Sequence, residues 1–259
     1  MKDLYTEERR TLILKNIEAN SRVSVSELAK HFNVSEATIR TDLRYLEDKN
    51  LLQRTRGGAI AADENDLSFA SRLTQHIDEK QAIALASLQY IHEHDSILFD
   101  ASSTCLELAK MLRKTDMTLT VITNGIHAAQ ALVDNPNITT MLIGGVLRNQ
   151  NNVEGLMGAE ILDKVYVKKF FFSARAASPE GDLMDFDLHE VDLKRRMFDK
   201  SMERYCLLDS SKLGKYSVGI FGSLAKTHTV ITDGGAEKMY AKSFPNLQIT
   251  TAKPLRSDK

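Results

Sequence analysis

Cysteine is almost absent from this chain of 259 residues, which holds only Cys105 and Cys206. The two lie far apart and in no metal-binding spacing, which argues against both a disulfide framework and a cysteine-based metal site. Long hydrophobic runs are also missing, since none approaches the roughly 18 to 20 residues of a membrane-spanning helix. The N-terminal segment MKDLYTEERR is polar, unlike a secretory signal. These absences predict a cytoplasmic protein without a membrane partner, in which both cysteines are buried apolar residues.

An excess of charge of either sign is missing as well, because the net charge is −1. That value alone neither indicates nor excludes a nucleic-acid partner. The distribution is uneven: residues 1–62 carry 11 Lys and Arg against 9 Asp and Glu, and the remainder carries 23 against 26. The length suits one small module and one domain of ordinary size, and a hydrophobic content of 42% indicates a globular chain.

Three short helices are predicted in the first fifty residues. The segment 6–20 has one helical stripe, formed by Arg9, Leu12, Ile13 and Ile17. Ser24 and Glu27 have the spacing of a capping box at the start of a second helix, which ends near Phe32. After the turn NVS, Ser35 can cap a third helix, whose inward positions are Ile39, Leu43 and Leu46.

The outward face of the third helix carries side chains suited to DNA. A short helix pair with Thr and Arg on the second helix matches the helix-turn-helix layout, in which that helix reads base edges. The segment LLQRTRGGAIA then predicts two strands around a turn at residues 56–58, which form a wing. The candidate DNA-binding residues are Ser35, Thr38, Arg40, Thr41, Arg44, Arg54 and Arg56. A three-helix subdomain with a merely solvated charged face is the alternative, and the order of these features disfavours it.

These residues carry a resemblance to a known family. The segment ILKNIEANSRVSVSELAKHFNVSEATIRTDLRYLEDKNLLQRTRGGA resembles the winged helix-turn-helix of DeoR-type transcriptional regulators, with their V-S-x-x-T-I-R-R-D-L run and terminal H-G-G-A. Two positions depart from the pattern. Thr41 replaces the second arginine, and Arg56 stands where histidine is common. Operator preferences of the family therefore do not transfer to this chain.

Beyond a polar segment, the chain predicts an α/β domain. We assign residues 1–62 to the winged helix-turn-helix, 63–77 to a linker and 78–253 to the second domain. Apolar runs alternate there with helical patterns, which indicates a mostly parallel sheet covered by helices. The runs are SILFDASST, LTVITNG, TTMLIGGV, KKFFFSA, RYCLLDSSK and HTVITDGG.

Polar groups follow these runs at the carboxyl ends of the predicted strands, where ligands of open α/β sheets bind. Hydroxyl groups and backbone N–H groups at a helix start can bind an anion, glycines allow close approach, and Lys and Arg neutralise phosphate. Carboxylates can accept hydrogen bonds from sugar hydroxyl groups. The candidate effector-binding residues are Asp100, Ser102, Ser103, Thr104, Thr123, Asn124, Gly144, Gly145, Arg148, Arg175, Glu190, Lys194, Asp209 and Lys212. Each signal is weak by itself, and the shared position at strand ends favours a site for a phosphorylated polyol.

The second domain resembles the C-terminal sensor domain of the same family, through DASST, TVITNG, LIGGV, VEGLMGAE and LLDSSKLG in the family's order. That domain is similar in fold to ribose-5-phosphate isomerase and glucosamine-6-phosphate deaminase, so the resemblance implies a sugar-phosphate effector. The segment FSARAASPEGDLMD departs from the family's Gly-rich pattern, and Ser173 and Arg175 within it can alter ligand choice.

Three functions follow as alternatives. The first is an operator-binding regulator, a repressor of a sugar-catabolic operon that a phosphorylated sugar relieves, acting as a homodimer or homotetramer without metal or cofactor. The second is a sugar-phosphate isomerase or deaminase with an accessory DNA-binding module, for which Asp100 and Glu190 are nominal bases. The third is an architectural DNA binder whose second domain only oligomerises. The absence of a separate catalytic constellation and the polar strand ends favour the first.

Overall fold

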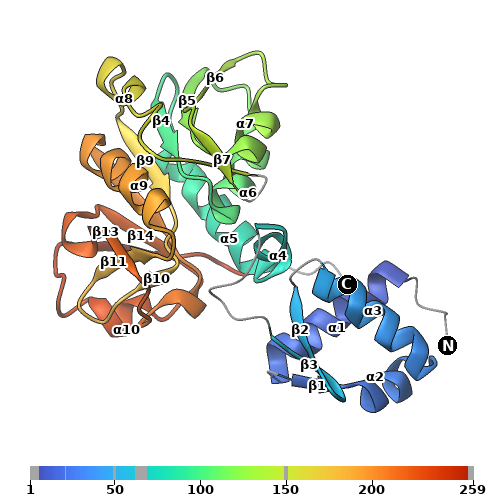
Figure 1. Ribbon diagram of the computed structural model, residues 1–259. Helices are drawn as coiled ribbons and strands as arrows, with labels where there is room; N and C mark the ends of the chain where they lie inside the picture. The colour runs from blue at the N-terminus through green and yellow to red at the C-terminus, as the bar shows by residue number, and fades with distance from the viewer. Residues whose placement is uncertain (1–5, 21, 49–50, 62–68, 149–150, 256–259) are drawn as a thin grey trace. The chain divides into compact units, whose positions relative to one another are not determined.

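A computed structural model describes residues 6–20, 22–48, 51–61, 69–148 and 151–255. The chain divides into two compact units, Met1–Gln75 and His76–Lys259 (Figure 1). The linker expected over 63–77 falls partly outside the described residues, and its later part contains helix α4 (Phe69–Thr74). Within the described residues, no helix is long and apolar enough to cross a membrane.

The first unit has the elements that the sequence predicts, in the predicted order. They are α1 (Thr6–Asn20), α2 (Val25–Phe32), α3 (Glu36–Asp48), β2 (Leu52–Thr55) and β3 (Gly58–Ala61), together with an unpredicted strand β1 (Arg22–Ser24). The three strands form an antiparallel sheet in the order β1-β3-β2. The helices and the sheet enclose a small core, formed by Ile13, Ile17, Val25, Leu28, Ala29, Phe32, Ile39, Leu43, Leu46, Leu52 and Ala59.

Caps and one glycine fix the geometry of this unit. The hydroxyl of Ser24 accepts a hydrogen bond from the Glu27 backbone N–H at 3.1 Å, and Ser35 caps α3 in the same way through Thr38 at 3.1 Å. Asn33 ends α2 in the left-handed conformation, with φ of 54°. A side chain on Gly58 would lie 1.8 Å from the carbonyl oxygen of Val23, so only glycine lets β1 pair with the wing here.

One predicted inward position in α1 is wrong. Leu12 is 37% exposed, whereas Ile13 and Ile17 are buried as expected. Arg9 is buried too, but as a charged group: its Nε atom lies 2.7 Å from Oδ2 of the buried Asp42 on α3. Helical spacing indicates the face of a residue only to within one position. The buried stripe of α1 runs through Arg9, Ile13 and Ile17, and Arg9 is buried there as the ion-pair partner of Asp42.

The second unit is built on a parallel sheet of seven strands. Their order is β15-β14-β12-β9-β4-β5-β6, and every neighbouring pair is parallel. The strands are β4 (Ser96–Phe99), β5 (Leu119–Thr123), β6 (Ile138–Leu142), β9 (Lys169–Phe172), β12 (Glu203–Leu207), β14 (Thr229–Thr232) and β15 (Gln248–Thr251). Six of them lie in the six predicted runs, and β15 is an addition.

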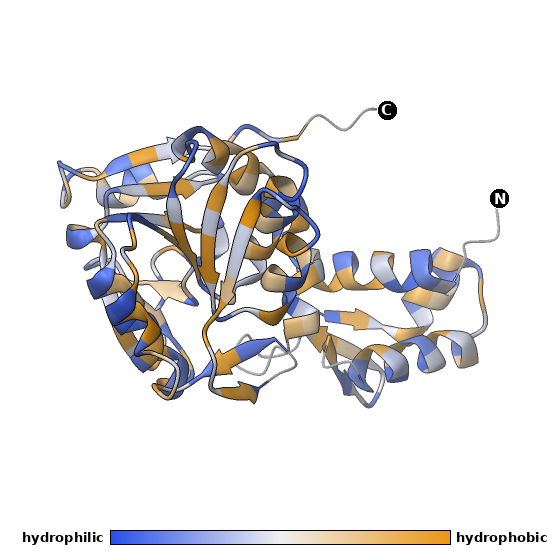
Figure 2. Cartoon of the chain, turned by 90° about the horizontal axis from the view of Figure 1, so that it is seen from above, coloured by the Kyte–Doolittle hydropathy of each residue, from blue (hydrophilic) through white to orange (hydrophobic). Residues whose placement is uncertain are grey.

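Helices cover both faces of this sheet. They are α5 (Ile77–Ser87), α6 (Ser103–Leu112), α7 (Ile126–Leu132), α8 (Ile161–Lys164), α9 (Leu188–Lys200) and α10 (Ala236–Tyr240), with short 3-10 turns η1 (Leu88–Tyr90), η2 (Ser210–Lys212) and η3 (Leu224–Lys226). Leu98 and Phe170 face one core with α9, and Phe99 and Phe171 face a second core with α5 and α6. The sheet is therefore hydrophobic on both faces, and its strands carry hydrophobic residues, coloured orange in Figure 2. Both cysteines are buried and unpaired, as predicted.

Two small antiparallel additions were not predicted, and both bring charged residues to the sheet. The first is a three-stranded sheet of β10 (Ala176–Ala177), β11 (Asp182–Asp185) and β13 (Gly219–Ser223). The second is a hairpin of β7 (Val146–Arg148) and β8 (Asn152–Glu154). These strands have two to five residues each, too few to give a readable alternation of polar and apolar positions.

Candidate functional site

The first unit exposes arginines on α3 and on the wing. The guanidinium groups differ in what they contact: Arg40 Nη2 lies 2.7 Å from Glu36 Oε2, and Arg54 Nη1 lies 3.4 Å from Glu47 Oε2. Arg44 and Arg56 are exposed, and neither forms an ion pair with any described residue. Among the described residues, Arg44 and Arg56 therefore present positive charges to solvent that no carboxylate accompanies.

The predicted hydroxyl groups of α3 have local partners. Ser35 Oγ and Thr38 Oγ1 lie 2.8 Å apart, and Thr41 Oγ1 donates to the Ala37 carbonyl at 3.0 Å. Ser35 thus serves first as a helix cap, while Thr41 is exposed. A hydroxyl that donates to the backbone still offers its oxygen as an acceptor. The structure brings these residues and Arg44 onto one helix, as the sequence predicts.

A buried ion network anchors α3 to α1, and sequence reasoning missed it. Asp42 has a side chain that is 2% exposed, with Arg9 Nε at 2.7 Å and Arg10 Nε at 3.0 Å. Arg10 also stacks over the ring of Tyr45, 3.7 Å from its centroid. Because both arginines come from α1, this network fixes the orientation of the helix that carries Thr41 and Arg44.

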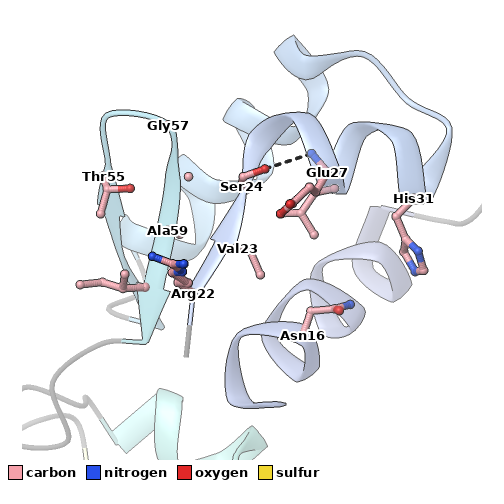
Figure 3. Close-up of a pocket in the computed structure, with 12 residues that line it drawn as sticks. Asn16, Arg22, Val23, Ser24, Glu27, His31, Thr55, Gly57 and Ala59 are labelled. Carbon is pink, nitrogen blue, oxygen red and sulfur yellow. Dashed lines mark hydrogen bonds between the residues drawn. The ribbon is translucent and has the colours of Figure 1, made fainter. Parts of the chain in front are cut away.

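A groove of about 1010 Å³ lies on another side of the first unit (Figure 3). Figure 3 shows Asn16 of α1, Ser24 of β1, Glu27 of α2 and the wing residues Thr55 and Gly57 around it. None of the seven candidate DNA-binding residues lines this groove. It is formed where the β1 strand and the wing meet the first two helices.

The second unit buries a lysine among three carboxylates at the carboxyl end of the sheet. Lys194 Nζ lies 2.5 Å from Asp185 Oδ2, 3.0 Å from Asp100 Oδ2 and 3.5 Å from Glu190 Oε1, and its side chain is 4% exposed. It also donates to the Ser173 carbonyl at 3.2 Å. The candidate residues Glu190 and Lys194, one helical turn apart on α9, are therefore part of a buried network and not a solvated surface pair.

Burial and charge act against each other in this network. Burial opposes the charge on Lys194, but Asp185, Asp100 and Glu190 outweigh burial and raise the pKa of the ammonium group. Burial would raise the pKa of Asp100, yet Lys194 and hydrogen bonds from neighbouring groups hold it below its usual value. Burial, with repulsion from Glu190, raises the pKa of Asp185 to about 6 in spite of Lys194. One ammonium group thus contacts carboxylates whose pKa values differ: that of Asp100 is lowered and that of Asp185 is raised.

A second group of charged residues, Lys212 and Asp209, is connected to this network through Ser173. Its hydroxyl accepts a hydrogen bond from Lys212 Nζ at 3.0 Å, and Lys212 lies 3.2 Å from Asp209 Oδ2. Burial opposes the charge on Asp209, but Lys212, His76 and Lys80 are among the groups that lower its pKa. His76 and the buried Lys80 belong to the segment that opens this unit, and no motif in the sequence marks them as candidates.

The β8 strand lies across the ends of β4 and β5. Asn124 and Val153 exchange backbone and side-chain hydrogen bonds of 2.9 and 3.0 Å, and Asn151 Nδ2 donates to the Ala101 carbonyl at 2.8 Å. Thr123 Oγ1 accepts from the Gly125 backbone N–H at 3.0 Å. The two candidate residues Thr123 and Asn124 therefore hold the backbone of this region in place.

The paired glycines have different surroundings. A side chain on Gly145 would lie 2.5 Å from the carbonyl oxygen of Glu154, so Gly145 allows the two strands of the hairpin to approach. Gly144 has open space at the same position.

Ser102 caps α6 by accepting a hydrogen bond from the Cys105 backbone N–H at 3.2 Å. The Arg175 backbone N–H donates to Asp185 Oδ1 at 3.0 Å, which links the unusual segment to the lysine network.

Several buried oxygens near the strand ends accept no hydrogen bond from any described residue. They are Thr104 Oγ1, Asn124 Oδ1, Asn152 Oδ1 and both carboxylate oxygens of Glu154. Buried polar atoms without a partner are costly, and a bound ligand or water is the usual partner. Glu154, Asn152 and Asp185 were missed by sequence reasoning because they lie on the unpredicted short strands. Among the described residues, no group of three His, Cys, Asp or Glu side chains is arranged to hold a metal ion.

Comparisons with known proteins agree with the two-part arrangement. A model described as the DeoR-like helix-turn-helix domain matches residues 9–65, and one described as the DeoR C-terminal sensor domain matches residues 75–234. The chain is 34% identical to the HTH-type transcriptional regulator GolR of Listeria innocua, over 93% of this chain and 96% of that protein. It is 33% identical to the L-fucose operon activator of Haemophilus influenzae, over 87% and 91%, and 29% identical to the glycerol-3-phosphate regulon repressor of Escherichia coli, over 87% and 90%. Among solved structures, a ribose-5-phosphate isomerase in complex with phospho-erythronic acid has a TM-score of 0.40 and 15% identity over 52% of each chain.

Proposed function

The chain belongs to the DeoR family of helix-turn-helix transcriptional regulators, and from this premise we propose that it represses a sugar-catabolic operon until a phosphorylated sugar binds its second unit. The operator is contacted by α3 and the wing. The sugar phosphate binds at the carboxyl end of the parallel sheet. Such a regulator works where its DNA is, so we place it in the cytoplasm.

The observation that carries the sensor part of this proposal is the set of buried acceptors at the strand ends. Thr104 and Asn124 lie beside the start of α6 and the end of β5, and their side-chain oxygens accept no hydrogen bond from the described residues. Asp100 and Lys194 lie at the same edge, joined at 3.0 Å. A sugar has several hydroxyl donors for such acceptors, and its phosphate suits Lys212 and the N-terminal end of α6.

On the DNA side, the proposal rests on the position of exposed positive charge. Arg44 on α3 and Arg56 on the wing are free of ion pairs with described residues, while Arg40 and Arg54 hold carboxylates that a phosphate can replace. The proposed contacts also include the hydroxyl groups of Ser35, Thr38 and Thr41. Arginine and hydroxyl side chains are the usual partners of phosphates and base edges.

Repression is the direction we propose, although the relatives include both kinds of regulator. The protein from Escherichia coli is named a repressor, and the one from Haemophilus influenzae is named an activator. A reporter fused to the regulated promoter decides this point. We expect deletion of the gene to raise reporter expression, and lower expression would assign the opposite direction.

The full-length relatives are named transcriptional regulators rather than enzymes, which sets aside the isomerase or deaminase alternative. We further propose an even-numbered assembly, a homodimer or homotetramer, because paired recognition helices match paired half-sites on DNA. Sedimentation of the full chain with and without operator DNA tests this proposal.

Two measurements test the function as a whole. Genomic fragments retained by the purified chain are sequenced, and the recovered site is compared with a scrambled duplex. Thermal unfolding is then followed with phosphorylated and free sugars, since a ligand at a hundredfold excess over its Kd stabilises by about 2.7 kcal/mol. We expect a phosphorylated sugar to stabilise the chain and to release the recovered site without being consumed. Turnover of that sugar, or release by the free sugar alone, would contradict the proposal.

A further inference from the structure

The β7–β8 hairpin carries a buried carboxylate whose acceptor positions are unfilled. Glu154 is 2% exposed, and neither carboxylate oxygen accepts a hydrogen bond from a described residue. Arg148 Nε lies 3.2 Å from Oε2, and the Arg148 side chain is 55% exposed. Burying a carboxylate without hydrogen bonds is unfavourable, so the arrangement suits a donor that is not among the described residues, such as a ligand hydroxyl group.

The hairpin places this carboxylate at the strand ends. The preceding residues 151–153 are hydrogen-bonded across β4 and β5, through Asn124, Ala101 and Ile126. On its other side, β8 packs against α9, the helix that carries Glu190 and Lys194. Glu154 therefore lies between the ends of two central strands and the first turn of α9.

The charges around Glu154 disfavour an anion there. Asp187 and Glu190 repel its carboxylate, while Arg148 and His189 attract it. Asp187 is committed to capping α9, with its Oδ1 accepting from the His189 backbone N–H at 2.8 Å, and Glu190 is paired with Lys194. Burial together with this repulsion raises the pKa of Glu154 to about 7. A phosphate is unsuited to such surroundings, and a hydroxyl group suits them.

We propose that Glu154 binds a hydroxyl group of the effector, at the end remote from its phosphate, so that the β7–β8 hairpin selects which sugar phosphate is recognised. This inference rests on the proposed function. We place the phosphate toward Lys212 and the start of α6, and the hydroxyl end toward Glu154 and its acidic neighbours Asp187 and Glu190. Glu154 is thus a residue that distinguishes effectors by their hydroxyl groups and contributes little to phosphate affinity.

The test compares three forms of the full chain by titration calorimetry: the natural sequence, Glu154→Gln, and Glu160→Gln as a matched control at an exposed carboxylate six residues further along. The probes are ribose 5-phosphate, fructose 1-phosphate, fructose 6-phosphate, glucose 6-phosphate and inorganic phosphate. We expect a sugar phosphate that binds the natural chain to bind Glu154→Gln at least about tenfold more weakly. Inorganic phosphate is expected to bind the variant equally well or more tightly, because a negative charge has been removed.

The outcomes separate the two proposals. Equal sugar-phosphate affinity in the natural chain and Glu154→Gln overturns the role of Glu154 and leaves the proposed function intact. A parallel loss for sugar phosphates and inorganic phosphate assigns Glu154 a structural role and also overturns the inference. If no sugar phosphate binds the natural chain, the proposed sensor function fails and this inference fails with it. The calorimetric melting transition of the second unit in each variant verifies that this unit is folded.

Discussion

The two units treat charge in opposite ways. The first keeps its candidate DNA-binding arginines at the surface, with the Arg40 side chain 59% exposed and Arg44 and Arg56 exposed as well. The second buries its charges, with Lys194 4% and Asp100 1% exposed. A surface arginine can exchange water and counterions for DNA phosphates at little cost, whereas a buried charge needs a fixed partner. The difference indicates a reversible contact with a polyanion in one unit and a shaped site for a small ligand in the other.

The strongest test of the comparison removes the central cation of the buried network. Lys194→Met leaves Asp100, Asp185 and Glu190 without their ammonium partner, so we expect the second unit to lose about 3 to 5 kcal/mol of stability. Arg195→Met, on the exposed side of the same helix, is the control and should change stability by less than about 0.5 kcal/mol. Calorimetry of the full chain reports the transition of each unit. Equal effects of the two substitutions would contradict the account of the network.

Among its described residues, the first unit buries one ion pair, Arg9 with Asp42, and removing its carboxylate tests this exception to the pattern. Asp42→Ala abolishes the pairs with Arg9 and Arg10, and we expect a loss of about 2 to 3 kcal/mol, since the arginines can reach water once released. The calorimetric transition of the first unit measures this loss, and Asp48→Ala at the exposed end of α3 serves as the control. An unchanged transition would mean that the network does not anchor α3.

Substitutions of the surface arginines sharpen the contrast further. Arg44→Ala should weaken operator binding by about 1 to 3 kcal/mol if Arg44 reads a base. If Arg44 contacts phosphate, the substitution should weaken binding to all duplexes and lower the slope of log K against log salt concentration by about one. Glu36→Gln, which releases Arg40 from its pair, should strengthen binding. Fluorescence anisotropy with operator and scrambled duplexes distinguishes these results. No change on either duplex would remove α3 from the interface.

The smallest effect expected is a change in pH dependence. The pKa of Glu154 is about 7 in the folded chain, above its ordinary 4.5. Between these values the folded chain holds a proton that the unfolded chain has released, so this group's contribution to stability falls as the pH rises from 4.5 to 7. Glu154→Gln removes this contribution, so the melting temperature of the second unit should fall less steeply than in the natural chain between about pH 4.5 and about pH 7, while the raised pKa of Asp185 leaves a fall of its own in the variant. The same slope in both proteins would contradict the raised pKa.

Much of the local structure was predictable because it depends on neighbouring residues. Ser24 and Ser35 cap the helices that their spacing indicates, and the wing turn lies where Arg56 and Gly57 predict it. Leu12 was misplaced because a helical stripe indicates direction only coarsely, and the burial of Arg9 depends on Asp42, which lies 33 positions away in the sequence. The contacts of the candidate DNA-binding and effector-binding residues with their ligands stay predictions.

Local spacing was enough to predict the helix order, the wing, six strands of the sheet and the residue types at their ends, because the carboxyl ends of parallel strands share an edge. Which charged side chains meet depends instead on the packing of distant segments. Lys194 joins Asp100 and Asp185 from distant segments, and Glu154 reaches the same region on a three-residue strand. Such contacts depend on how separate elements pack, and no periodicity in the chain records them.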